Sequence, residues 1–225
     1  MEESTITSKK KLIWCDQCKR NSCRKGYPEG KPDYCQALAD PEIIPSALAR
    51  YNVPDTLRIQ DAATQVLERQ RKSEYGWPRI KENIEFAKGL GVKKVGIAAC
   101  MSMLGQASEF AKLIRLAGLE PCTVGCMAGG MPNNEIGVPA GRDSPPCNPI
   151  IQAEVLNRAG TEFNFIYGLC IGHDTLFIQH SEAPVSVVLV KDRITGNNPG
   201  AVLFSSYYRE KLWAEYGGVS DNKKL

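Results

Sequence analysis

From residue 54 onward, the sequence alternates between short apolar segments and longer stretches whose apolar residues recur at helical spacing. A parallel strand pair needs a crossover of a dozen or more residues, which is the length of these helical stretches. The pattern therefore predicts a Rossmann-like α/β domain, with a mostly parallel sheet and helices on both faces. The expected strands are residues 94–100, 121–126, 163–169 and 185–190, and the expected helices are 56–74, 78–90, 104–117, 149–159, 174–180 and 199–216.

The character of the chain changes near residue 53. Before this point the sequence is polar, interrupted by prolines and rich in cysteine. A chain of 225 residues can hold one ordinary domain with a small attachment, and it can bury a core without crosslinks. We therefore expect a cysteine-rich metal-binding segment at 1–53 and an α/β domain over 54–225.

Composition and charge exclude several classes of function. The net charge of +3 is too small for the clustered basic face of a nucleic-acid-binding protein. The longest aliphatic run, 187–190, is too short to span a bilayer, and no apolar signal segment follows the N-terminus. We therefore expect a cytoplasmic protein that binds neither nucleic acid nor membrane. In that reducing compartment, clustered cysteines favour metal ligands or catalytic thiols over disulfides.

The first group of cysteines, which we call the N-terminal set, lies within 21 residues. Four thiolates can close a tetrahedral zinc site or hold the corners of an iron–sulfur cluster. The spacing indicates a metal without deciding between zinc and iron, and unligated or disulfide-bonded cysteines are the competing interpretation. The segment has few large apolar side chains, so its folding energy could come from the metal. The N-terminal set is Cys15, Cys18, Cys23 and Cys35.

The second group, which we call the edge set, is scattered along the α/β region. Cys100, Cys126 and Cys170 each end an expected strand, and Cys147 precedes the helix that begins near residue 149. The carboxyl ends of parallel strands share one edge, where open α/β folds bind ligands. A single such cysteine would be an ordinary buried residue, but four at one edge predict a metal or cofactor site. Cys122 lies early in its strand, so we assign it to packing.

A histidine and a charged turn accompany the predicted edge. The stretch from Gly168 to Thr175 reads as a strand end, a glycine turn and a helix start, whose N–H groups favour an anion. His173 is the candidate catalytic residue, as a proton donor near neutral pH, although a simple loop histidine is the alternative. Asp174 is expected to cap the helix. Lys191 to Arg193 ends the last strand and either binds an anion or forms a solvated turn.

These blocks, together with Cys147-Asn148-Pro149, resemble an uncharacterised family of cysteine-rich, metal-binding proteins of anaerobic bacteria and archaea. The resemblance covers nearly the whole chain and implies metal binding without an established reaction. The cysteines at strand ends are similar, more loosely, to iron–sulfur desulfidases of the thiouracil-desulfidase type. In those proteins three cysteines hold a cluster and one iron stays open to sulfur.

The leading hypothesis is an iron–sulfur protein with a redox or sulfur-transfer role. The edge set would hold a [4Fe–4S] cluster, and the N-terminal set a second cluster or zinc. The implied partner is an electron-transfer protein or a small sulfur-containing or anionic ligand. One competing class is a zinc-stabilised binding module without catalysis. Another is a thiol enzyme that uses one cysteine without metal.

Overall fold

The computed structural model describes residues 14–19, 23, 35–38, 40–137 and 145–218. It separates into two compact units, Met1–Asp61 and Ala62–Leu225. The division falls inside helix α2 (Pro54–Arg71), whereas the change in sequence character lies just before that helix. In the part of the chain that is described, no helix is both long enough and apolar enough to cross a bilayer.

In the N-terminal unit, the described residues next to the cysteines form short 3₁₀ turns. Two 3₁₀ turns, η1 (Cys15–Gln17) and η3 (Gln36–Leu38), precede helix α1 (Ile43–Tyr51). The sequence analysis did not predict α1, because prolines were taken to interrupt this segment. Pro45 lies in the first turn of the helix, where a missing N–H costs no hydrogen bond. None of the described residues up to Asp61 is buried.

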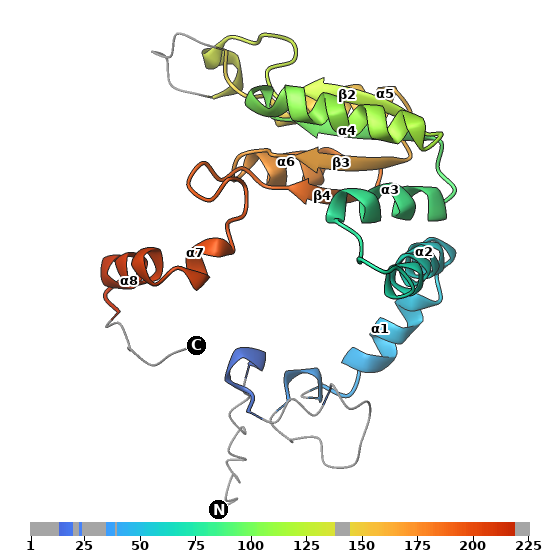
Figure 1. The fold of residues 1–225 in the computed structure, drawn as a ribbon, viewed down its shortest axis with the longest axis vertical. Helices are drawn as coiled ribbons and strands as arrows, with labels where there is room; N and C mark the ends of the chain where they lie inside the picture. The colour runs from blue at the N-terminus through green and yellow to red at the C-terminus, as the bar shows by residue number, and fades with distance from the viewer. Residues whose placement is uncertain (1–13, 20–22, 24–34, 39, 138–144, 219–225) are drawn as a thin grey trace, which may run out of the picture. The chain divides into compact units, whose positions relative to one another are not determined.

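The second unit is an α/β fold with a four-stranded sheet (Figure 1). All strand pairs are parallel, and the strand order is β2-β1-β3-β4, as expected for helical crossovers. The expected C-terminal helix is two short helices, because Ser205 between them is extended. The elements of this unit are α3 (Arg79–Gly89), β1 (Lys94–Ala99), η4 (Met101–Met103), α4 (Leu104–Leu116), β2 (Glu120–Gly125), η5 (Asn133–Ile136), α5 (Pro149–Arg158), β3 (Phe163–Tyr167), α6 (His173–His180), β4 (Val185–Leu189), α7 (Ala201–Phe204) and α8 (Ser206–Glu215).

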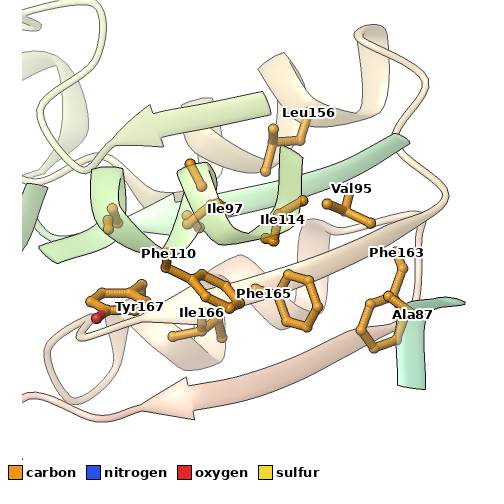
Figure 2. Close-up of a cluster of buried hydrophobic side chains, with 14 of the residues drawn as sticks. Ala87, Val95, Ile97, Phe110, Ile114, Leu156, Phe163, Phe165, Ile166 and Tyr167 are labelled. Carbon is orange, nitrogen blue, oxygen red and sulfur yellow. The ribbon is translucent and has the colours of Figure 1, made fainter. Parts of the chain in front are cut away.

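The core lies around the two central strands, β1 and β3. All five residues of β3 are buried, as are the last five of β1. Successive side chains of a strand point to opposite faces, so both faces of the sheet are covered. On one face the ring of Phe110 from α4 packs against Phe165, with ring centroids 5.3 Å apart, and against Tyr167 (Figure 2). This packing holds the carboxyl end of β3, which lies three residues before Cys170.

Candidate functional site

The backbone brings the edge set to the carboxyl end of the sheet, as the topology predicts. Cys100 and Cys126 follow β1 and β2 directly, and Cys170 lies three residues after β3. Cys147 comes at the end of the long connection between β2 and α5. It lies next to Cys126 because the N–H of Asn148 donates to the carbonyl oxygen of Cys126 at 2.6 Å. Cysteines separated by up to 70 positions in the chain therefore lie at the same edge of the sheet.

The closest sulfur atoms are those of Cys126 and Cys147, whose Sγ atoms lie 3.5 Å apart. The N–H of Met101 also donates to Cys126 Sγ, at 3.3 Å. The contacts of Cys100 Sγ are polar, with the Lys191 ammonium donating to it at 3.2 Å and the Ser102 hydroxyl lying at 3.3 Å. The Lys191 ammonium also donates to Ser102 Oγ. The edge therefore has a thiol pair on one side and a sulfur held by a lysine on the other.

Cys100, Cys126 and Cys170 differ in how readily their thiols ionise. Burial raises the pKa of Cys126 to about 12, and the neighbouring Cys147 contributes to that rise. Burial acts in the same direction on Cys100, but hydrogen bonds from Ser102 and Lys191 outweigh it and lower the pKa of that thiol. Burial raises the pKa of Cys170, and the charges of Cys100 and Cys147 add to the rise. Of these three thiols, Cys100 is the one whose surroundings favour the thiolate.

As a metal site the edge set is incomplete in this conformation. Within the described ranges, no group of three or more His, Cys, Asp or Glu side chains is positioned to hold a metal ion. Cys126 and Cys147 are close enough to share one ion, and a metal site here would require a third ligand to approach them. The electrostatic effects that link Cys170 with Cys100 and Cys147 place these thiols in one neighbourhood.

Two features that support the edge escaped the sequence analysis. The side-chain amide of Gln152, fully buried in α5, donates to the carbonyl oxygens of Ala99 and Val124 at 3.2 and 2.7 Å. It thus joins the ends of β1 and β2, one residue before Cys100 and two residues before Cys126. The available signal was a polar residue on the face of α5 that also carries Ala153 and Leu156.

The second feature is a glycine, Gly168, that leaves room for the segment after β1 to pack closely against the end of β3. Gly168 has a φ of +71°, and a Cβ there would lie 2.2 Å from the sulfur of Met103. Only glycine combines this backbone conformation with so close an approach. The glycine therefore keeps the Cys100 loop against the end of β3.

Helix α6 follows the glycine turn, as expected, but it begins at His173 and not at Asp174. His173 is half-buried and is the first residue of the helix, and its N–H donates to the carbonyl oxygen of Cys170 at 3.0 Å. The expected Asp174 cap is wrong, because the helix begins one residue earlier, after Gly172 at φ +80°. The Asp174 carboxylate instead accepts from the N–H of Thr175. By contrast Asn148 caps α5 as predicted, accepting from the N–H of Ile151 at 3.1 Å.

The remaining cysteines are Cys122 and the four of the N-terminal set. Cys122 is in β2, opposite Gly96 of β1, and packs against the core, which agrees with its assignment to packing. In the N-terminal set, Cys15 and Cys23 are exposed and Cys18 and Cys35 are half-buried. The structure describes each of the four, and the residues between them lie mostly outside the described ranges.

Fold and site together define a parallel α/β protein with cysteines gathered at the carboxyl edge of its sheet. The chain belongs to the family described as protein of unknown function (DUF1847), whose model matches residues 35–188. That range includes the whole edge set and begins at the last cysteine of the N-terminal set. The chain is also 32% identical over 201 residues to an uncharacterised protein of the archaeon Methanocaldococcus jannaschii, MJ0455. The alignment covers 88% of this chain and 97% of that protein.

Proposed function

We propose that this chain is an iron–sulfur protein with a redox or sulfur-transfer role, whose functional centre is held by the edge set. The observation that carries the proposal is the gathering of four thiols from distant parts of the chain, with two sulfur atoms 3.5 Å apart. Thiolates are ligands for soft metal ions, and clusters of them are the protein ligands of iron–sulfur centres. An ordinary packing role does not require four cysteines at the ligand-binding edge of the sheet.

The Cys126–Cys147 separation indicates how a metal would be shared. Two thiolates on one tetrahedral ion with metal–sulfur bonds near 2.3 Å lie about 3.8 Å apart, close to the observed 3.5 Å. The pair therefore suits one common metal ion, as in a two-iron cluster whose irons each take two cysteines. The expected [4Fe–4S] cluster, with one cysteine for each iron, requires these two sulfur atoms to move apart. Cys100 and Cys170 supply the remaining thiolates.

The surrounding residues suit chemistry on an anionic ligand. Lys191 and Arg193 bring positive charge to the edge, where both oppose the rise in the pKa of Cys170. His173 begins α6 three residues after Cys170, and it is the candidate proton donor. When bound, an iron–sulfur centre supplies an electron or a site for sulfur, and these side chains hold the charge and proton that accompany it. The N-terminal set carries a second metal, with a structural role.

Metal and sulfide analysis after anaerobic purification and reconstitution tests the proposal. We expect iron and acid-labile sulfide in similar amounts, together with the visible absorption of an iron–sulfur centre. A colourless protein without iron after reconstitution would overturn the proposal. Zinc without sulfide, with an unchanged fold in the Cys100→Ser, Cys126→Ser and Cys170→Ser variants, would instead identify a zinc-stabilised binding module.

One observation favours a second candidate, a thiol enzyme that needs no metal. The contacts of Cys100 with Ser102 and Lys191 lower the pKa of this one thiol, which is how nucleophilic cysteines are activated. This candidate predicts that a protein purified without metal is alkylated rapidly at Cys100 alone. It also predicts that Cys126→Ser leaves the alkylation rate unchanged.

A further inference from the structure

Among the described residues that follow β4, only Lys191 has a side chain that hydrogen-bonds to an edge-set sulfur. It comes two residues after the end of β4, the strand at the side of the sheet opposite β2. Its backbone N–H donates to the carbonyl oxygen of Leu169 at 3.2 Å, which fixes it beside the end of β3. From there its ammonium reaches Cys100 Sγ, after β1. The side chain thus crosses the end of β3 and joins the segment after β4 to the loop after β1.

The ammonium has two partners at this edge, and both belong to the loop after β1. It donates to Cys100 Sγ at 3.2 Å and to Ser102 Oγ, which itself lies 3.3 Å from the same sulfur. The adjacent Asp192 has other hydrogen-bond partners. Its Oδ1 accepts from the N–H groups of Ile194 and Thr195 at 2.9 and 3.1 Å. The charge of Lys191 is therefore directed at the thiol and not at the neighbouring carboxylate.

Metal binding increases the need for that charge. Four thiolates around one divalent ion carry two net negative charges, in a place where burial already disfavours charge. A hydrogen bond from an ammonium to a sulfur ligand offsets part of this charge and also fixes the direction of the sulfur. Outer partners of this kind change metal affinity about 10- to 100-fold.

We propose that Lys191 is a positioning residue of the edge centre, whose ammonium holds Cys100 Sγ and compensates the negative charge of the metal-bound thiolates. The inference rests on the proposed function, because it requires that the edge set binds metal. It adds a residue outside the ligand set, and it gives the charged turn after β4 a role other than that of a solvated loop.

Titration of the full chain with Co²⁺ under anaerobic conditions tests this inference, because thiolate ligation produces sulfur-to-cobalt charge-transfer bands. The protein is metal-free and carries serine in place of Cys15, Cys18, Cys23 and Cys35, a background that is wild type at the edge set, so the bands report that set alone. We expect Lys191→Met to weaken Co²⁺ binding about tenfold or more, on the order expected for loss of an outer ligand partner. The charge-transfer band should move to lower energy, since the sulfur lone pairs lose a hydrogen bond. Lys191→Arg should restore most of the affinity, because it keeps the charge and a donor.

Lys93→Met is the matched control. It makes the same substitution at an exposed lysine directly before β1, at the opposite end of the sheet from the edge set, so the affinity and the band position should stay unchanged. If wild type and Lys191→Met give the same affinity and band, the role of Lys191 is refuted and the metal centre stands. Tighter binding by Lys191→Met would also refute it, because the ammonium would then compete with metal. If the wild type gives no thiolate band from the edge set, the proposed function itself fails.

Discussion

The two cysteine sets contrast in what holds them in place. In the N-terminal unit, none of the described residues is buried, and Cys15 and Cys23 are exposed. The edge set stands on a packed sheet, with Cys100 7% and Cys126 3% exposed. Four thiols close in sequence depend on a ligand to organise them, whereas the fold itself brings the four edge thiols to one end of the sheet. This contrast is the basis on which we propose a structural role for the first set and a functional role for the second.

The largest expected effect is that of metal removal on the N-terminal unit. Structural metal binding contributes roughly 10 kcal/mol or more to folding in small metal-dependent segments, and this unit has no buried side chains among its described residues to replace that contribution. Treatment with a strong chelator should therefore open residues 1–61 to proteolysis while residues 62–225 resist it. If both units resist the protease equally after complete metal removal, the N-terminal unit does not depend on metal for its structure.

A substitution in the core should have the opposite effect: it should destabilise the α/β unit and leave the N-terminal unit unchanged. Phe165→Ala removes a fully buried ring that packs against Phe110 and Phe163, so we expect a loss of about 3–5 kcal/mol in the free energy of unfolding of the α/β unit. Urea unfolding measures this loss. Metal bound by the N-terminal set should be retained under conditions that unfold the mutant α/β unit, and its simultaneous release would show that the sets depend on one fold.

The support beneath the edge set can be removed more selectively. Gln152→Met preserves volume but leaves the carbonyl oxygens of Ala99 and Val124 without this donor, at an expected cost of about 2 kcal/mol. Thermal or urea unfolding measures the change. Gln106→Met, on an exposed position of α4, is the control and should stay within about 0.5 kcal/mol of wild type. Equal stability of the two variants would argue against Gln152 as the link between the strand ends.

The smallest effect is a dependence on pH in the metal-free protein. The folded chain raises the pKa of Cys126 from 9.0 to about 12, so folding stabilises the protonated thiol. This contribution is complete below about pH 9 and is lost as the pH rises toward 12. The urea midpoint of wild type should therefore fall more steeply between pH 9 and pH 12 than that of Cys126→Ala. Parallel slopes for the two proteins would show that burial does not act on this thiol.

The sequence predicted the sheet and the position of the edge set because both follow from local patterns and one topological rule. Each strand has an apolar segment, and parallel connections bring strand ends together whatever the intervening sequence. The cap at Asn148 has an equally local cause. Helix α1 was missed because the prolines of its segment were taken as breaks, although Pro45 occupies a first-turn position that tolerates proline.

What could not be predicted depends on side chains meeting across the fold. The contact of Lys191 with Cys100 spans 91 positions, and that of Gln152 with Ala99 spans 53. The spacing of cysteines indicates neither contact, nor that Cys126 and Cys147 form the closest pair. The start of α6 was misplaced by one residue, because a left-handed glycine and not a side-chain cap begins it.

Metal content in two matched serine variants tests the central claim most directly. Cys126 and Cys122 both come from the β2 region, but only Cys126 touches another sulfur of the edge set. After anaerobic reconstitution, Cys126→Ser should lose the iron and sulfide of the edge centre and keep the metal of the N-terminal set, while Cys122→Ser should keep both. Equal iron and sulfide in the two variants would contradict a metal centre at the edge of the sheet.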